Sequence, residues 1–432
     1  MNIYLSMAKT NDMDNLIPPL NLLVLASVLE KTGHRVKIIF PVELDDFLKG
    51  LPQNLKDCDI FGISANSFNW HATKHVIREI HRHYPNIVIV LGGPHPTFFH
   101  KYCLESTSAQ IVIRNEGEIT FPLVIQALAE NSSLSSIQGV TYKTNKGDVT
   151  VNQDRPILTE KELDSMPVPA YQLIPRNKYG FIPMETSRGC FFRCIFCGIP
   201  FPRRYRKISL ERVERILSTL NSLTDRFVKR AIFLSDDSFS AHKDHAIGVL
   251  KLVEKTNTDF SIGCEARITE IIKNGLISYF EKVKVSVLQV GVECGYDEGL
   301  KTIRKQLTIG KILEFARCCP DTSFHYELYW SFIIGFPWET DHHVLETINF
   351  AFRCATMSRS RSPQINNFNP CPGSELVDKY KQYGLQEIKP DFYDDASWFR
   401  PFLGHTSISP SRRDYLLNYL HQKHQQHPDF RL

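Results

Sequence analysis

Long apolar runs and a large excess of charge of either sign are both missing from this 432-residue chain. It has no uninterrupted stretch of the roughly 18 apolar residues that a membrane-spanning helix needs, so no membrane partner is expected. The formal net charge is only +4, which does not indicate a nucleic-acid partner. The first residues lack the basic and apolar segments of a signal peptide. Eleven cysteines, an odd number, fit a reducing compartment, so a cytoplasmic protein is expected.

Structural zinc is commonly held by two C-x2-C pairs, and this chain has only one such pair. The chain instead has one run with the spacing C-x3-C-x2-C, formed by Cys190, Cys194 and Cys197. Three thiolates on one short loop can bind three irons of a [4Fe–4S] cluster and leave the fourth iron free for a small ligand. The alternatives are a zinc site and three unrelated thiols.

This run resembles the signature of radical S-adenosylmethionine (SAM) enzymes. Phe196 matches the aromatic residue that the family has just before its third cysteine, and it would lie near the adenine of SAM. The resemblance implies that Cys190, Cys194 and Cys197 hold a [4Fe–4S] cluster whose free iron binds SAM. An electron from a reductant such as flavodoxin or ferredoxin would then cleave SAM to methionine and a 5'-deoxyadenosyl radical.

Short, apolar, β-branched segments alternate with helical patterns along most of the chain, which predicts an α/β fold. Residues 1–152 are expected to form a doubly wound parallel sheet, with a β-hairpin over residues 136–152. The proline-rich residues 153–180 predict a linker. Residues 181–385 are expected to form a partial (β/α)6 barrel, and residues 386–432 a tail. The expected strands are Ile3–Met7, Val36–Phe40, Ile60–Ala65, Ile87–Leu91, Ala109–Ile113, Ile182–Glu185, Ala231–Leu234, Ser261–Glu265, Val285–Val292, Trp330–Ile334 and Gln364–Phe368.

This order of domains resembles radical SAM enzymes with an N-terminal cobalamin-binding-type domain. The landmarks include Gly92-Gly93-Pro94-His95 and Asn115-Glu116-Gly117-Glu118. The first loop, Lys9–Pro18, lacks the histidine that ligates cobalt in many such domains. Histidine ligation from this loop is therefore excluded, and two alternatives stay open: cobalamin bound without it, or a domain reused for substrate binding.

Three charged residues follow predicted barrel strands: Glu265, Arg267 and Glu293. By resemblance, Arg267 and Glu293 would contact the ribose hydroxyls or the carboxylate of SAM, with Glu265 beside them. SAM carries a sulfonium cation, a carboxylate and a diol, so its site needs side chains of both charge signs. The alternative is an ion pair across the barrel mouth that binds no ligand.

Cys371, in the run Pro370-Cys371-Pro372-Gly373 after the last predicted strand, suggests a specific reaction. The weak S–H bond of a thiol lets it donate a hydrogen atom to a carbon radical. This arrangement resembles radical SAM peptide epimerases, notably those of the proteusin type. We therefore expect an enzyme that converts L- to D-residues in a ribosomally made precursor peptide, with its leader and core as partner. The alternative for Cys371 is an ordinary buried cysteine.

Two other functions remain open. The first is a cobalamin-dependent radical SAM C-methyltransferase, for which Cys371 would be incidental. The second is a non-catalytic cluster-bearing binding or electron-transfer protein, which would leave SAM intact. Bound cobalamin and a methylated product would favour the methyltransferase.

Overall fold

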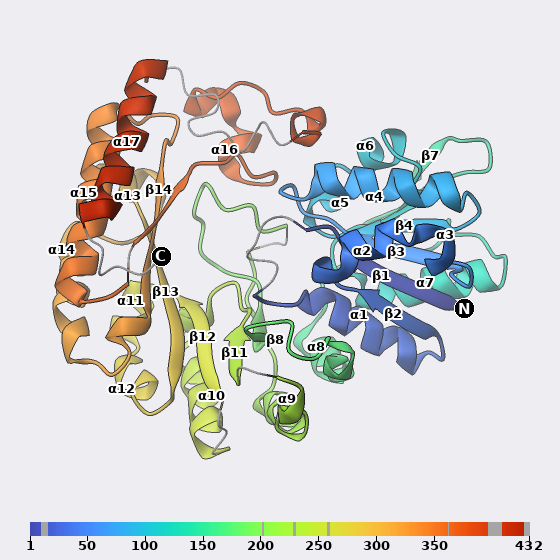
Figure 1. Cartoon of the computed structure of the whole chain (residues 1–432), viewed down its shortest axis with the longest axis horizontal. Helices are drawn as coiled ribbons and strands as arrows, with labels where there is room; N and C mark the ends of the chain where they lie inside the picture. The colour runs from blue at the N-terminus through green and yellow to red at the C-terminus, as the bar shows by residue number, and fades with distance from the viewer. Residues whose placement is uncertain are drawn as a thin grey trace.

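The computed structural model of the chain describes residues 1–9, 16–200, 203–227, 230–256, 260–361, 363–395 and 408–426. Two sheets with their own helices lie side by side, the N-terminal one and the barrel sheet, joined by a short connecting segment (Figure 1). The expected first loop falls partly outside these ranges, at residues 10–15, and so does part of the expected tail. Within these ranges, no helix combines the length and the apolar character that membrane crossing requires.

The N-terminal sheet has seven strands in the order β2-β1-β3-β4-β5-β6-β7. Strands β1 to β5 pair in parallel, whereas β6 and β7 join antiparallel as the expected hairpin. The order of the parallel strands places a topological switch point between β1 and β3, where ligands bind outside the carboxyl ends of the strands. The strands are β1 (Asn2–Met7), β2 (Arg35–Ile39), β3 (Ile60–Ser64), β4 (Val88–Gly92), β5 (Ile111–Ile113), β6 (Val140–Lys143) and β7 (Val149–Val151).

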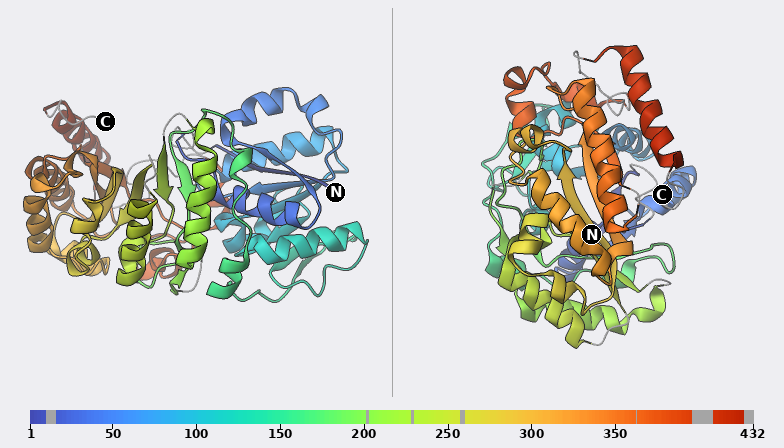
Figure 2. Two further views of the ribbon diagram at one scale, coloured as in Figure 1. Left: turned by 90° about the horizontal axis from the view of Figure 1, so that it is seen from below. Right: turned by 90° about the vertical axis from the view of Figure 1, so that its left-hand side faces the viewer.

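Helices cover both faces of this sheet because successive side chains of a strand point to opposite sides. Ile3 and Leu5 pack with residues of helices α1 and α7, whereas Tyr4 packs on the other face with residues of α2, α4 and α6. Figure 2 shows helices on both sides of the sheet. The helices are α1 (Leu20–Lys31), α2 (Leu44–Lys49), α3 (Leu51–Asn54), α4 (Trp70–His83), α5 (Pro94–Phe98), α6 (His100–Glu105) and α7 (Gly117–Ala129).

The segment between the two sheets is packed against both of them. Helix α8 (Glu160–Ser165) begins at a capping box between Thr159 and Glu162. Beyond it, Tyr171 is fully buried and its hydroxyl donates to the Pro183 carbonyl oxygen at 2.9 Å. The Ala170 amide donates to the Leu23 carbonyl oxygen of α1 at 3.0 Å. The segment therefore holds the first sheet beside the second.

The second sheet has six parallel strands in the order β15-β14-β13-β12-β11-β8. This consecutive order confirms the expected partial (β/α)6 barrel, and with the first sheet it confirms the α/β fold class. The carboxyl ends of its strands lie at one edge, where active sites of such barrels form. The strands are β8 (Ile182–Met184), β11 (Ala231–Leu234), β12 (Ser261–Ala266), β13 (Val285–Glu293), β14 (Leu328–Ile334) and β15 (Gln364–Asn367).

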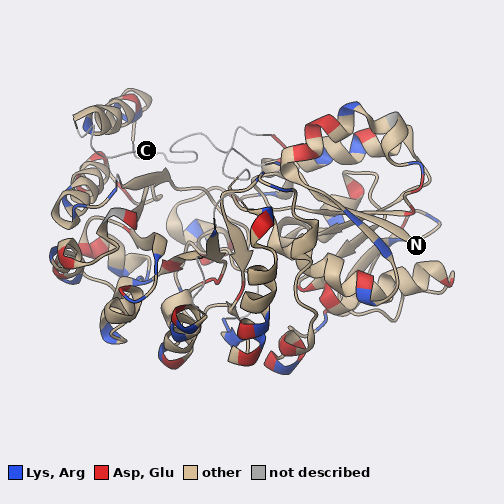
Figure 3. Cartoon of the chain, turned by 60° about the horizontal axis from the view of Figure 1, so that its bottom comes forward, with Lys and Arg blue, Asp and Glu red and all other residues tan. Residues whose placement is uncertain are grey.

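Amphipathic helices cover the outside of the barrel. Helix α9 buries Val213, Ile216 and Leu217, at the spacing of one helical face. Charged residues of both signs lie along the helices, whereas the barrel strands carry few of them (Figure 3). The helices are α9 (Leu210–Ser222), α10 (Lys243–Lys255), α11 (Ile268–Lys273), α12 (Ile277–Phe280), α13 (Asp297–Thr302), α14 (Ile309–Cys318), α15 (Asp341–Ser358), α16 (Glu375–Asp378) and α17 (Pro410–Gln426).

The chain after the barrel returns to the N-terminal domain. Tyr393 is fully buried. Its neighbour Asp394 accepts a hydrogen bond from the Trp70 indole at 3.0 Å and forms an ion pair with Lys74 at 2.9 Å. Helix α17 packs along α15 through Leu416. Residues 386–395 of the expected tail thus tie the two domains together.

Candidate active site between the two domains

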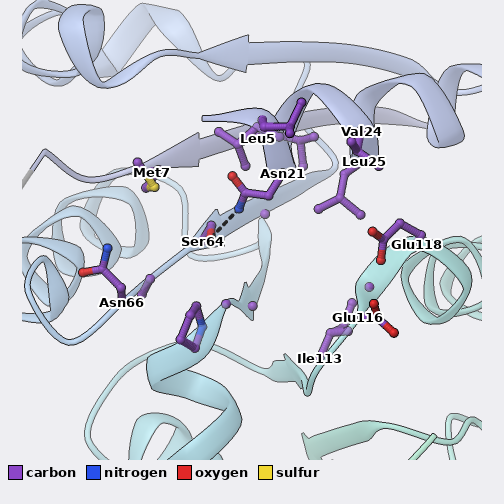
Figure 4. Close-up of a pocket in the computed structure, with 18 of the residues that line it drawn as sticks. Leu5, Met7, Asn21, Val24, Leu25, Ser64, Asn66, Ile113, Glu116 and Glu118 are labelled. Atoms are coloured by element: carbon purple, nitrogen blue, oxygen red, sulfur yellow. Dashed lines mark hydrogen bonds between the residues drawn. The ribbon is translucent and has the colours of Figure 1, made fainter. Parts of the chain in front are cut away.

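A large cavity opens where the carboxyl ends of β1, β3, β4 and β5 face the barrel. Its volume is about 530 Å³, and both domains line it. Gly92 ends β4, Asn66 and Glu116 come from the loops after β3 and β5, and Glu185 and Asp237 come from the barrel. Figure 4 shows its N-terminal wall. We call this cavity the interdomain pocket.

The lining of the interdomain pocket combines apolar side chains with polar and charged ones. Leu5, Leu25 and Phe121 line its deep part beside Gly62, between the sheet and helices α1 and α7. At the rim, the Asn21 amide donates to the Ser64 hydroxyl at 2.8 Å (Figure 4). Cobalamin is a flat, amide-rich macrocycle with a planar base on a nucleotide arm, and an apolar slot with a polar rim fits such a molecule.

Two glycines shape the edge of this pocket. Gly93 has a φ of +97°, and a Cβ built there would lie 2.5 Å from the Ala65 carbonyl oxygen, so the turn requires glycine. A Cβ on Gly92 would meet only the Ile113 carbonyl oxygen, at 3.9 Å, so this backbone borders open space. The Gly-Gly run therefore both makes a turn and lines the pocket.

His95 does not join this lining. It is fully buried behind the turn, stacked on Trp70 with ring centroids 4.5 Å apart, and Ser67 bonds its Nδ1 at 3.0 Å. Burial lowers the pKa of His95 to about 3, so the ring stays neutral near pH 7. His95 is therefore part of the packing beneath the turn.

A second cavity, of about 190 Å³, opens at the barrel mouth. We call it the cluster pocket. Its lining includes every site residue expected from the sequence except Cys371, namely Cys190, Cys194, Cys197, Phe196, Glu265, Arg267 and Glu293. The structure thus brings together side chains from the cysteine run and from the ends of β12 and β13.

The three cysteines lie on a loop closed by a short hairpin, β9 (Ser187–Arg188) with β10 (Arg206–Lys207). Gly189 begins the loop with a φ of +85°, and a Cβ there would lie 2.1 Å from the Arg204 carbonyl oxygen. The Gly189 amide donates to Asp237 Oδ2 at 2.7 Å. On the far side, the Ile195 amide reaches the Ile303 carbonyl oxygen at 3.3 Å. The start of the loop and a point within it are therefore both anchored to the barrel.

The thiols suit a cluster that spans several ångströms. They line one pocket together, and the charges of Cys194 and Cys197 both act on the Cys190 thiol. Burial raises the pKa of the Cys190 thiol to about 11. Iron binds the thiolate, so the positive charge of Arg267, whose Nη1 lies 3.6 Å from Cys194 Sγ, favours ligation. The residues present fit a [4Fe–4S] cluster.

Arg267 and Glu293 are held by a residue that the sequence did not single out, Lys305. The Lys305 ammonium donates to Glu293 Oε1 at 2.7 Å, and its carbonyl oxygen accepts a hydrogen bond from Arg267. The Arg267 guanidinium stacks over the Phe192 ring at 3.8 Å. Lys305 lies twelve residues beyond Glu293 in an irregular turn, so no periodic pattern points to it.

The cluster pocket carries both charge signs, as a SAM site needs. Glu265 lines it, and burial together with the nearby Glu293 carboxylate raises the pKa of Glu265. Arg267 and Lys305 supply the positive charge. Glu293 itself has a φ of +77°, a left-handed backbone that is strained for a residue with a side chain. Such strain concentrates at ligand sites, which favours a functional role for this strand end.

Asp237 joins the two cavities, since it lines both of them. Its neighbour Asp236 is instead buried and accepts from the Thr186 amide at 2.7 Å and the Ser187 hydroxyl at 2.7 Å. Asp237 is open to the pockets, but the protein around it displaces water from the carboxylate and raises the pKa of Asp237 above its usual value. Of the two adjacent carboxylates, Asp236 therefore braces the hairpin and Asp237 faces the space between the pockets.

Cys371 lies beside the cluster loop, close enough to Cys197 that the charge of that thiolate adds to the effect of burial and raises its pKa. A Cβ built on Gly198 would lie 2.9 Å from Cys371 Cβ, so the cysteine packs against the loop backbone. Burial raises the pKa of its thiol to about 11. Cys371 is not among the described residues that line the interdomain pocket or the cluster pocket. Its role as hydrogen donor was a prediction from one thiol beside Pro-Gly, a weak signal.

Comparison with known proteins identifies the families of the two domains that line the site. The B12 binding domain family matches residues 10–125, and the radical SAM superfamily matches residues 184–351. An uncharacterized methyltransferase of Pyrococcus horikoshii is 32% identical over 344 residues, which cover 77% of this chain and 73% of that protein. The chain is a radical SAM protein with a B12 binding domain. Its cofactors are accordingly a [4Fe–4S] cluster, SAM and cobalamin.

Solved structures share the whole architecture. The radical SAM methyltransferase TsrM of Kitasatospora setae, with cobalamin and a [4Fe–4S] cluster bound, has a TM-score of 0.71, 16% identity and coverage of 90% of this chain and 76% of its own. The cobalamin-dependent radical SAM enzyme OxsB has a TM-score of 0.68, 18% identity and coverage of 98% of this chain. The chain spans 61% of the length of OxsB. At these identities the likeness shows a common fold.

The prediction of a peptide epimerase is wrong. The relative and the TsrM structure are both described as methyltransferases. The prediction rested on Cys371 alone, whereas the match to the Pyrococcus horikoshii methyltransferase covers 77% of this chain. A single cysteine carries little information because free cysteines commonly serve as small buried residues. The isomerase and ribosomal-peptide assignments depended on that reading and fall with it.

Proposed function

We propose that this radical SAM enzyme is a cobalamin-dependent C-methyltransferase. One observation carries the proposal: a pocket suited to a corrin opens beside the cluster pocket, and Asp237 lines both. A methyl donor and a radical generator must reach the same substrate, so adjacent pockets that share a wall suit this reaction. The relative from Pyrococcus horikoshii, described as a methyltransferase, supports the same class.

Residues of the chain have distinct roles in this proposal. Cys190, Cys194 and Cys197 would hold the cluster, and Arg267, Glu265 and Glu293 would bind the charged groups and the diol of SAM. Lys305 would orient Glu293, to which it donates at 2.7 Å. Phe196, whose ring lies 6.0 Å from the Phe336 ring, would provide an aromatic face for adenine.

When bound, cobalamin supplies a methyl carrier, and the cluster with SAM supplies radical initiation. The chain's contribution is to hold both groups against one substrate and to exclude water. The apolar wall of the interdomain pocket removes water from one side. Asp237 would orient the substrate, because only one of its carboxylate oxygens accepts a hydrogen bond from the Gly189 amide. The electron would come from an external reductant such as a flavodoxin or ferredoxin.

The test is the fate of SAM in anaerobically reconstituted enzyme with dithionite. A methyltransferase should form S-adenosylhomocysteine only when hydroxocobalamin is supplied, because the methyl group leaves SAM for the corrin. Formation of 5'-deoxyadenosine with no S-adenosylhomocysteine, whether or not hydroxocobalamin is present, would contradict the proposal. Trideuteromethyl-SAM added to lysates of the source cells would then raise the mass of the substrate by about 17 units, because a CD3 group replaces one hydrogen atom.

A further inference from the structure

The hairpin that closes the cluster loop contains an unfavourable pair. Its ladder has only two residue pairs, Arg206 with Arg188 and Lys207 with Ser187. Two strands this short are marginal by themselves, and like charges at directly opposed positions repel. The loop of residues 189–205, which carries all three cluster cysteines, therefore needs an anion at its base.

The N-terminal domain supplies this anion. Glu116, in the loop after β5, accepts from Arg188 Nη1 at 2.7 Å and from Arg206 Nη1 at 2.8 and 2.9 Å. Its side chain is 3% exposed, and that of Arg206 is fully buried. Glu116 Oε2 also accepts from the Leu158 amide at 2.5 Å. One carboxylate thus joins the first domain, the connecting segment and the base of the cluster loop.

Two further carboxylates complete the network around Arg188. Glu118 Oε1 lies 2.8 Å from Arg188 Nη1, and Glu185 Oε2 lies 2.9 Å from Arg188 Nη2. Burial by itself would lower the pKa of the Arg188 guanidinium, but these carboxylates raise it well above its usual value. A buried charged network of this kind specifies geometry more reliably than it adds stability.

The same side chains form part of the interdomain pocket. Glu116, Glu118, Glu185 and Arg188 all belong to its lining, and Figure 4 shows Glu116 and Glu118 at the edge beside α7. The network therefore touches the corrin pocket at one end and the base of the cluster loop at the other.

We propose that Glu116, Glu118, Arg188 and Arg206 are positioning residues that set the distance between cobalamin and the iron–sulfur cluster. This inference rests on the proposed function, because it assumes that both groups are bound together. The four residues act through the cluster loop and the corrin pocket wall. They fix where each group sits relative to the substrate.

The experiment measures that distance directly. The full chain is reconstituted with iron, sulfide and hydroxocobalamin and reduced until the cluster and the cobalt are both paramagnetic. Pulsed electron paramagnetic resonance then gives the distance distribution between them. The deciding variant is Glu118→Gln, which removes one anion at Arg188 and leaves every contact of Glu116 in place. Glu116→Gln is the stronger variant, and it is used where it folds.

A matched control is Asp341→Asn. Asp341 accepts from Arg412 at 2.7 Å on the surface between α15 and α17, and neither residue lines a described pocket. This control removes a carboxylate–guanidinium pair without touching the network. Iron and cobalamin contents are measured for each protein, so that distances are compared only between fully loaded samples.

We expect one narrow distance for the wild type and for Asp341→Asn. Glu118→Gln should shift or broaden that distribution and weaken hydroxocobalamin binding by about tenfold, the effect of losing one charged hydrogen bond. An unchanged distribution in loaded Glu118→Gln would overturn the positioning role alone. A wild type that takes up no hydroxocobalamin would overturn the proposed function, and this inference with it.

Discussion

The two pockets of this protein are built from different materials. The interdomain pocket is lined largely by apolar side chains and glycine backbone, with polar side chains such as Asn21 and Ser64 and charged ones such as Glu116 and Arg188 beside them. The cluster pocket is lined by thiols and by charged side chains such as Arg267 and Glu293. A large, amide-rich corrin can be held by shape, whereas a charged cluster and a sulfonium need charge and thiolate ligands. Substitutions should therefore damage the two sites in different ways.

The largest expected effect abolishes the function of the cluster pocket and leaves that of the interdomain pocket intact. Cys197→Ala removes one of three iron ligands, so we expect loss of the cluster and of all SAM cleavage. Hydroxocobalamin binding should persist, because the interdomain pocket contains none of the three cysteines. Iron content, 5'-deoxyadenosine and the corrin absorption spectrum report the three properties. Cys318→Ala, at an exposed cysteine, is the control and should keep all three.

Filling the interdomain pocket should have the opposite outcome, with hydroxocobalamin binding weakened and the cluster retained. Gly92→Leu places a side chain into open space, since a Cβ there meets only one atom, at 3.9 Å. We expect hydroxocobalamin affinity to fall by up to roughly a hundredfold, the size of an overpacking penalty. The iron content should stay at the wild-type level. Equilibrium binding measures the affinity, and Gly310→Leu, on helix α14, should bind normally. Undiminished binding by Gly92→Leu would mean that cobalamin lies elsewhere.

Within the cluster pocket, charge can be removed without touching the thiols. Lys305→Met should weaken SAM binding by roughly ten- to hundredfold, because it leaves the Glu293 carboxylate buried without its 2.7 Å partner. Cluster content should not change. Isothermal titration under anaerobic conditions measures the affinity. Lys311→Met, at an exposed position on α14, is the control. Equal SAM affinity in the two variants would contradict the role assigned to Lys305.

Asp237 tests the wall that the two pockets share. Asp237→Asn keeps an acceptor for the Gly189 amide but removes the charge. We expect the affinities for hydroxocobalamin and SAM to change little. The rate of hydroxocobalamin-dependent S-adenosylhomocysteine formation should fall by about tenfold, through loss of one charged contact. A fall in either affinity that accounts for the whole loss of rate would place Asp237 in one pocket only.

The smallest expected effect is on the melting temperature and comes from Asp236, the buried neighbour of Asp237. Burial raises the pKa of Asp236 from 3.8 to about 7, so the folded protein binds this proton more tightly than the unfolded chain does. Its contribution is therefore fully present below pH 4 and is lost as pH rises toward about 7. The melting temperature of the wild type should fall relative to that of Asp236→Asn between pH 5 and 8, by about a few degrees. A constant difference across this range would show that Asp236 does not titrate there.

Much of the fold could be predicted because its signals are local. The five parallel strands of the first domain and the six of the barrel match the expected segments closely. Each is a short, apolar, β-branched run, and such runs are read from neighbouring residues alone. The three cysteines proposed as cluster ligands can be found for the same reason, from one C-x3-C-x2-C spacing. Cys371 misled the prediction of function because its chemistry depends on what it faces, and here it packs against Gly198.

The sequence by itself determined the α/β class and the partial barrel, and it predicted three cysteines as cluster ligands and charged residues at the strand ends, since each of these depends on residues close together in the chain. Only the tertiary structure decided that Lys305 holds Glu293, that Asp237 lines both pockets, and that Glu116 closes the cluster loop across 90 residues. These pairings depend on how two sheets pack against each other. No local pattern encodes such a contact, because it forms only when distant segments bury their surfaces together.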